Sequence, residues 1–449
     1  MSSPKHPLLG DSYHLTPFSL VLDYSTSVIW LALLVLMSYG LFRTQYSVME
    51  RGIRGIVLCG LGTAAVALLH WLHDDGLLFG VFEPEFVVSA ERARWPFVNP
   101  NHLGHFLLIP LAFSFFVVLI EYRAASRVLR AAARGRRASL SFIYSLPNVQ
   151  KRFLSLFFWL GAACIILLAF SLTLSRSSWI AASFLATASA LFSFRKFTGA
   201  LEKNSKSQSQ PPLGRDHPSI VDVFTLRQLK SGRRVVRKHY IRSVLFPFLD
   251  RILFRPLKNH ILSILLVFSS SCLLFVFLQS GSFERIDTRL ESTYGKIGMD
   301  DTRLILYEDS IQMFLDAPLF GHGISTWSDL YSRYKSAELA DAKPRFLHSD
   351  PYQHLIELGI LGSLPLFLFM LWLVKRGLFP RRKTDSFHSG EVEAVKVIAR
   401  LSVVSLAALL LASFFDFPFH IPAITTLSAV VCGLALAASE PATKTSFSG

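Results

Sequence analysis

Residues 103–121 read LGHFLLIPLAFSFFVVLIE, a run that is apolar at nearly every position. A helix of this length covers about 28 Å at about 1.5 Å per residue, close to the roughly 30 Å hydrocarbon core of a bilayer. A segment in lipid has to bond its own backbone groups, so it is expected to be helical. We therefore predict an all-α, polytopic membrane protein with about nine transmembrane helices, the other eight runs lying at 25–42, 54–72, 153–174, 178–194, 260–279, 355–374, 398–415 and 422–438.

The composition of the 449 residues agrees with this class. Hydrophobic residues make up 51% of the chain, charged residues only 17%, and the mean hydropathy is +0.42. Residues 1–24 lack the basic start, short apolar core and small-residue cleavage site of a signal peptide, so the first apolar run is expected to remain as a helix. All four cysteines fall inside apolar runs, which favours packing over a disulfide or a metal site: Cys59, Cys164, Cys272 and Cys432.

The net charge of +15 is distributed unevenly, and the distribution predicts topology rather than nucleic-acid binding. Residues 122–152 carry eight Lys/Arg and no acid, 195–260 carry fifteen against four acids, and 375–400 carry seven against three. These loops are expected to be cytoplasmic. Residues 73–98 and 281–352 contain more acids than bases and are expected to face outside, with the N-terminus outside and the C-terminus inside.

Changes in composition divide the chain into four parts. Within the basic insert, 203–210 is expected to be a flexible linker and 219–256 an interfacial helix near anionic membrane lipids, with docking of a cytoplasmic partner as a further hypothesis. The predicted parts are N-terminal membrane helices with an Asn-rich outer loop (1–121), a basic cytoplasmic loop and a helix pair with Arg176 (122–194), the basic insert (195–259), and membrane helices with a periplasmic loop at 280–354 (260–449).

The long outer loop contains a predicted amphipathic helix that is expected to lie on the membrane. Asp301 and Thr302 are candidate caps, and Pro318 marks the stop. Arg303 would then occupy the first turn, where helix N–H groups and a guanidinium together favour phosphate. The apolar positions recur at helical spacing, at Leu304, Tyr307, Ile311, Phe314 and Leu315.

His348 stands immediately before another predicted helix start. Asp350, Pro351 and Gln353 form the pattern of an N-cap, a first-turn proline and a reciprocal cap, so Asp350 is expected to be a cap. His348 would lie on a loop at the interface, where neither packing nor a helix accounts for it. Arg176 sits between two apolar runs, and two interpretations stay open: an anion-binding residue, or an interfacial arginine beside Trp179.

Two further outer turns carry polar side chains. Asn99, Asn101, His102 and His105 could bond a sugar or phosphate, or could shape a turn and cap a helix. The stretch 416–422, DFPFHIP, places an Asp and a His between the last two spans. No metal site is predicted, because the adjacent acids at 74–75 and 300–301 are typical helix caps and no Cys/His zinc spacing occurs.

Together these motifs resemble the O-antigen ligase and polymerase family over roughly residues 95–375. The resemblance implies a GT-C-like inner-membrane glycosyltransferase with its active face periplasmic. It would move an undecaprenyl-diphosphate-linked glycan to lipid A-core or a growing glycan, without metal or cofactor. The motifs that carry it are NPNH (99–102), SRS (175–177), Arg303, APLFGHG (317–323), HSD (348–350), QHLIELGILG (353–362) and DFP (416–418).

Carried onto this sequence, the resemblance implies that Arg176 and Arg303 hold the diphosphate and that His348 acts on the acceptor hydroxyl, with inversion at the sugar carbon. The other expected substrate-binding residues are Asn99, Asn101, His102, His322, Asp350, His354 and Glu357. A transporter or flippase for an anion or lipid-linked sugar is the alternative. The absence of a visible internal repeat and the clustering of polar motifs at one face favour the enzyme.

Overall fold

The computed structural model describes residues 17–73, 77, 79, 81, 92–135, 147–191, 299–339, 344–380 and 389–440. Within these ranges the chain is helical and has no strand, which confirms the all-α prediction there. The predicted linker 203–210, interfacial helix 219–256 and span 260–279 lie outside the described residues.

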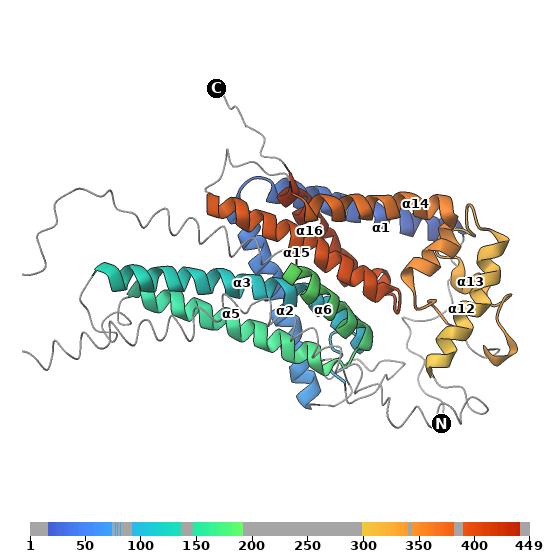
Figure 1. Ribbon diagram of the computed structural model, residues 1–449. Helices are drawn as coiled ribbons and strands as arrows, with labels where there is room; N and C mark the ends of the chain where they lie inside the picture. The colour runs from blue at the N-terminus through green and yellow to red at the C-terminus, as the bar shows by residue number, and fades with distance from the viewer. Residues whose placement is uncertain are drawn as a thin grey trace, which may run out of the picture.

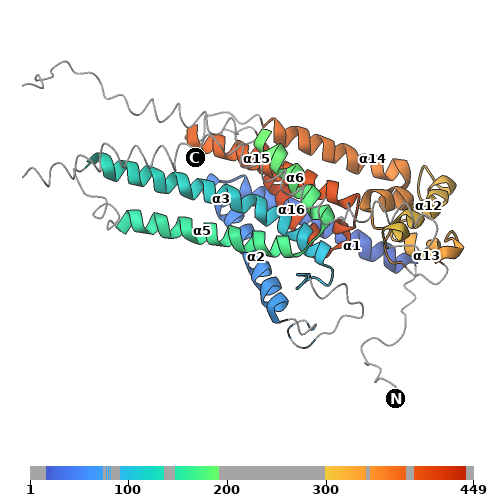
Figure 2. The same cartoon turned by 60° about the horizontal axis from the view of Figure 1, so that its bottom comes forward.

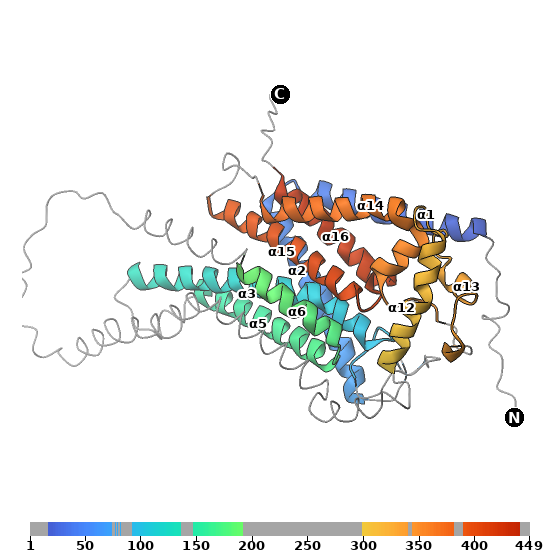
Figure 3. The same ribbon diagram turned by 45° about the vertical axis from the view of Figure 1, so that its right-hand side comes forward.

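Most of the long helices run in roughly the same direction, α2 crosses α3 and α5 steeply, and α12 and α13 lie across one end of this bundle (Figure 1). The rotated views in Figures 2 and 3 show the same arrangement. In order, the elements are α1 (Pro17–Phe42), α2 (Tyr46–His73), α3 (Pro100–Gly135), α5 (Pro147–Leu172), α6 (Arg176–Ser189), α12 (Met299–Asp316), α13 (Trp327–Tyr331), η5 (Ala337–Leu339), α14 (Asp350–Leu378), α15 (Ser389–Ser413), η7 (Pro418–His420) and α16 (Pro422–Ser439).

Six described helices are long and apolar enough to cross a membrane: α2, α3, α5, α14, α15 and α16. The predicted span 178–194 begins in α6, whose 14 residues extend about 21 Å, and residues 192–194 of this span lie outside the described residues. The predicted span 25–42 corresponds to a shorter apolar stretch, Thr26–Phe42, of α1. The chain is thus a multi-pass helical membrane protein, and the count of nine is not confirmed.

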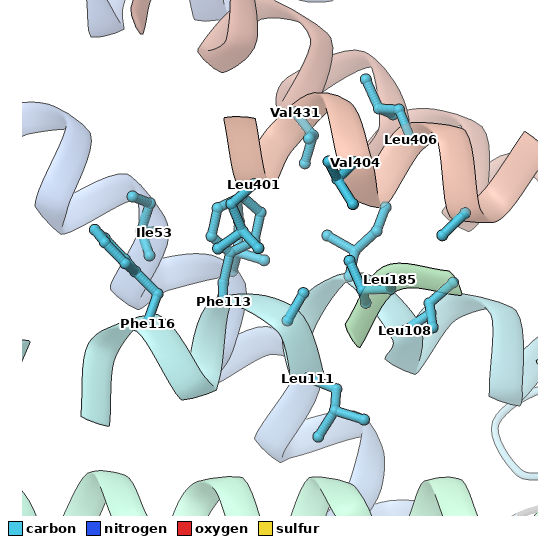
Figure 4. Close-up of a cluster of buried hydrophobic side chains, with 14 of the residues drawn as sticks. Ile53, Leu108, Leu111, Phe113, Phe116, Leu185, Leu401, Val404, Leu406 and Val431 are labelled. Atoms are coloured by element: carbon cyan, nitrogen blue, oxygen red, sulfur yellow. The ribbon is translucent and has the colours of Figure 1, made fainter. Parts of the chain in front are cut away.

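Helix α3, which contains the run at 103–121, is the centre of the bundle. In its most apolar stretch 83% of residues are buried, against 17% in α14 at the periphery. Figure 4 shows Phe113 and Phe116 of α3 directed toward Ile53 of α2 and Leu401 of α15. The side chains of α3 are apolar on every face because other helices surround it.

A cluster of charges joins α2, α3 and α5 at the end of the apolar stretch 103–121 of α3. The Arg54 guanidinium bonds Glu50 at 2.6 Å and the buried Glu121 at 2.5 Å, and it lies 5.1 Å from the Trp159 ring. Arg152 lies 3.9 Å from the other oxygen of Glu121. His102, near the start of α3, is about 28 Å of helix axis from Glu121 at about 1.5 Å per residue. The polar groups at the two ends of the apolar stretch 103–121 of α3 are therefore about one hydrocarbon thickness apart.

Helix α12 differs from its prediction in its start. It begins at Met299, so Asp301 and Thr302 lie inside the helix and Arg303 falls in the second turn. The buried positions are Leu306, Ser310 and Met313. Of the five predicted apolar positions, Tyr307 and Phe314 pack against the cluster that α12 forms with α13 and α14, whereas Leu304, Ile311 and Leu315 are more than 45% exposed.

The loop after α12 is held against a kink in α14. Gly359 has φ 65° and ψ −176°, a conformation open essentially to glycine alone. Four backbone hydrogen bonds of 2.9–3.1 Å join residues 318–323 to 356–361 on either side of this kink. A Cβ on Gly359 would clash with the Leu319 carbonyl, and one on Gly321 would clash with that of Glu357. The two segments are therefore paired through their backbones.

We expect Gly359→Ala to destabilise the protein. The strained conformation alone costs about 1–3 kcal/mol, and the clash with Leu319 adds to it. The measurement is the midpoint of thermal unfolding in detergent, with Gly62→Ala in α2 as the control, because a Cβ there meets no described atom within 4 Å. Equal midpoints for the two variants would contradict the role assigned to this pairing.

Candidate active site

His348 lies at the junction between the outer loop and α14, in a constrained backbone conformation. Its φ is +60°, which is uncommon for a residue other than glycine. The Tyr307 hydroxyl donates to the His348 carbonyl at 3.0 Å, so α12 helps to hold this turn. The imidazole is 30% exposed. This conformation turns the His348 ring toward the connection between α15 and α16, where it packs on Phe417 at 5.0 Å between ring centroids.

The prediction that Asp350 caps α14 is wrong. The N-cap position belongs to Ser349, and Asp350 is inside the helix. The Asp350 carboxylate instead accepts the Phe419 backbone N–H at 2.8 Å and contacts His420 Nδ1 at 2.5 Å. It binds η7 of the 416–420 connection, which no local sequence pattern reveals.

Asp416 is a fully buried carboxylate within this connection. Its Oδ1 accepts the Phe417 N–H at 3.0 Å and lies 3.7 Å from His348 Nδ1, an ion-pair contact longer than a hydrogen bond. Burial disfavours the charged form, but neighbouring histidine and arginine side chains outweigh it and hold the pKa of Asp416 well below its ordinary value. In order of effect these groups are His348, His105, His102 and Arg303.

Arg303 reaches the same connection from α12. Its guanidinium donates to the Phe415 carbonyl at 2.9 Å, one residue before Asp416. Tyr307 lies one helical turn after Arg303, and the charges of Arg303 and Asp416 both act on its hydroxyl. Burial, reinforced by Asp416 and opposed by Arg303, raises the pKa of Tyr307 above its ordinary value. Its hydroxyl therefore remains protonated and able to donate to His348 at neutral pH.

The start of α3 contributes its two histidines. The Asn101 N–H donates to Asn99 Oδ1 at 2.9 Å, so Asn99 shapes the turn that leads into the helix. His102 packs edge-on against Phe417 with ring centroids 4.8 Å apart. His105, one turn deeper and fully buried, lies 3.0 Å from Ser177 Oγ through Nε2. The histidines thus join the 416–420 connection to α6.

Helix α6 begins at Arg176, and a serine cluster fixes that start. Ser175 is the N-cap, and its hydroxyl accepts the Ser178 N–H at 3.4 Å and the Ser178 hydroxyl at 2.9 Å. A Cβ on Gly104 of α3 would come 2.5 Å from Ser178 Oγ, so only glycine permits this approach of the two helices. Arg176 is exposed in the first turn, where its charge adds to the helix N-terminus.

Arg92 is a site residue that sequence reasoning missed. Its Nε donates to the Thr173 carbonyl and one terminal nitrogen donates to Asn101 Oδ1, both at 2.7 Å. Burial and the nearby Arg176 charge lower the pKa of Arg92, while Asp416 opposes the shift. An arginine in an acid-rich outer loop gives no local signal of this role, although its place nine residues before Asn101 is visible in the sequence.

Four buried polar atoms around Asp416 have no hydrogen-bond partner among the described residues: His102 Nε2, His105 Nδ1, His348 Nδ1 and Asp416 Oδ2. Leaving one such group unsatisfied costs roughly 1–3 kcal/mol, so a native cluster of them calls for an explanation. A polar ligand or water at this place would satisfy them. These four atoms are thus available to form hydrogen bonds with a bound molecule.

Three predicted site residues, His322, His354 and Glu357, lie in the paired segments 318–323 and 356–361 or elsewhere on α14. The Glu357 carboxylate accepts the Ser325 N–H at 3.0 Å and the Trp327 N–H at 3.4 Å, which caps α13. His322 Nε2 lies 2.6 Å from the Met313 carbonyl. His354 bonds the Asp350 carbonyl at 2.7 Å through Nδ1 and lies 5.7 Å from the His420 ring. The structure places Glu357 and His322 in the support of the outer loop.

The remaining predicted residues converge at one end of the bundle. Arg303, His348, His102 and Asp350 meet around the 416–420 connection, and Arg176 is linked to it electrostatically through Arg92. Guanidinium groups beside a helix start can bind phosphate, and an imidazole against a carboxylate can accept a proton. Within the described ranges no group of three or more His, Cys, Asp or Glu side chains is arranged to hold a metal ion.

Comparison with known proteins identifies part of the chain. Residues 241–367 match the family model described as O-antigen ligase. The matched stretch includes Arg303, His322, His348 and the start of α14, and it confirms the resemblance drawn from the motifs. No curated protein and no solved structure matches the chain.

Proposed function

Because residues 241–367 form an O-antigen ligase family segment in a multi-pass helical membrane protein, we propose that the chain is a glycosyltransferase that uses a lipid-linked glycan. The donor is an undecaprenyl-diphosphate-linked glycan, and the acceptor is a hydroxyl of lipid A-core or of a growing glycan. Transfer takes place at the periplasmic face of the bacterial inner membrane.

The observation that carries this proposal is the convergence of Arg303 and His348 on Asp416. The three residues come from α12, from the turn before α14 and from the connection between α15 and α16. Arg176 at the start of α6 adds a further cation near Arg92. A diphosphate leaving group needs cations, and an acceptor hydroxyl needs a base; both are present at the same end of the bundle.

In the proposed reaction the acceptor oxygen attacks C1 of the donor sugar. His348 Nδ1 faces Asp416, so its Nε2 takes the proton from the acceptor hydroxyl. The new C1–O bond forms as the C1–O bond to the diphosphate breaks, and the electron pair leaves with the diphosphate. Arg176 and Arg303 stabilise the charge that develops there, and attack from the face opposite the leaving group inverts C1. No metal is needed in this scheme, because arginines supply the positive charge.

The position of the site along α3 supports a reaction at one membrane surface. His102 and Glu121 are about one bilayer core apart, and Glu121 is followed by the basic segment 122–152, which begins within α3 and is predicted to be cytoplasmic. The opposite end, with His102, would then face the periplasm, where lipid-linked glycans are displayed.

The test is mass spectrometry of products formed by the purified protein in EDTA with an undecaprenyl-diphosphate oligosaccharide, with and without lipid A-core. Lengthened lipid-linked glycan without core would identify a polymerase, and glycan on core only when core is supplied would identify a ligase. A protein that binds the donor but transfers nothing to either acceptor would count against the proposed transferase.

A further inference from the structure

Two segments distant in sequence exchange Asp–His contacts in opposite directions. His348 faces Asp416, and His420, four residues after Asp416, contacts Asp350, two residues after His348. Two backbone groups complete the exchange: the Phe419 N–H donates to Asp350 Oδ2 at 2.8 Å, and the Asp350 N–H donates to the Asp416 carbonyl at 3.3 Å. Segments 348–350 and 416–420 are therefore linked at four points.

The two Asp–His pairs differ in their geometry. His420 Nδ1 and Asp350 Oδ1 are 2.5 Å apart, a short hydrogen bond, whereas His348 Nδ1 and Asp416 Oδ1 are 3.7 Å apart. The His420 ring also packs 4.9 Å from Phe346, which stacks on Phe417. Asp350 is the first residue of the long helix α14, so its backbone position is held by that helix. The contact between His420 and Asp350 is thus the closer of the two pairs.

We propose that His420 and Asp350 are positioning residues that set the orientation of Asp416, and through it that of the base His348. This inference rests on the proposed function for its catalytic consequence. His420 is 23% exposed but its Nδ1 is already engaged, so it acts through the turn rather than on substrate. Releasing the turn would move the Asp416 carboxylate, which is buried and has only one hydrogen-bonded oxygen among the described contacts.

Two substitutions of His420 separate the hydrogen bond from packing. His420→Asn keeps an N–H donor near the place of Nδ1, and His420→Phe keeps a ring without a donor. We expect His420→Phe to lower kcat about 10²-fold, the size of effect produced by a misplacement of about 1 Å, with the KM for donor unchanged. His420→Asn should keep most of the wild-type kcat. His73→Phe, at the exposed end of α2, is the matched control.

A second measurement does not depend on transfer. The rate at which diethyl pyrocarbonate modifies His348, followed by peptide mass spectrometry, should change in His420→Phe and stay as in wild type in His420→Asn and His73→Phe. If this holds in a protein that transfers no glycan, the positioning role stands and the proposed function fails. Unchanged kcat and His348 reactivity in His420→Phe, equal losses in the Phe and Asn variants, or an effect on KM alone would each overturn the positioning role.

Discussion

His348→Ala is expected to reduce glycan transfer about 10²- to 10⁴-fold while the protein still binds the lipid-linked donor. General base catalysis contributes rate factors of this size. The main-chain turn should persist, because the Tyr307 hydroxyl bonds the backbone carbonyl rather than the imidazole. The measurement is initial transfer rate by mass spectrometry, with donor affinity determined separately.

The matched control is His73→Ala, an exposed histidine at the end of α2. It should transfer at the wild-type rate. A His348→Ala variant that transfers at full rate would contradict the assignment of the base. If the wild-type protein forms no product and the His348→Ala variant still transports a lipid-linked sugar normally, the transporter alternative would be favoured.

Arg303→Ala is expected to lower kcat about 10²- to 10³-fold, the usual loss when a group that stabilises developing charge is removed. Arg303→Lys should recover only part of it, because lysine keeps the charge but lacks the planar fork that can bond the Phe415 carbonyl and an anion together. The two variants are compared by kcat and by KM for the donor.

Arg333→Ala provides the control, since Arg333 is exposed after α13 in the same outer loop. It should leave both constants unchanged. If Lys restores full activity at position 303, charge alone suffices and the bidentate role is wrong. If Ala raises KM without lowering kcat, Arg303 binds donor equally in the ground state and the transition state.

The amino-acid sequence was sufficient to predict which segments form membrane helices and where the main polar groups lie along the chain. An apolar run about as long as a bilayer is thick can satisfy its backbone only as a helix, so α3, α5 and α16 followed from hydropathy. His348 was predicted to lie beside the start of α14 because turn and cap residues act over three or four positions.

The sequence also predicted features that the structure changed. The apolar positions of α12 divide between a face packed on the cluster with α13 and α14 and an exposed face, a division that helical spacing alone does not specify. Asp350 matched a cap pattern, yet its carboxylate bonds a turn nearly seventy residues away. Local patterns contain no information about such a partner.

Only the tertiary structure showed which side chains meet in the candidate site. Asp416, Arg92 and His420 gain their significance from contacts with residues that are far along the chain, such as His348, Thr173 and Asp350. The sequence by itself determined the helices, because hydrophobic length and capping are local properties of the chain. The packing of those helices determined the site, because burial in common surroundings brings the charges of distant segments within a few ångströms and so selects their partners.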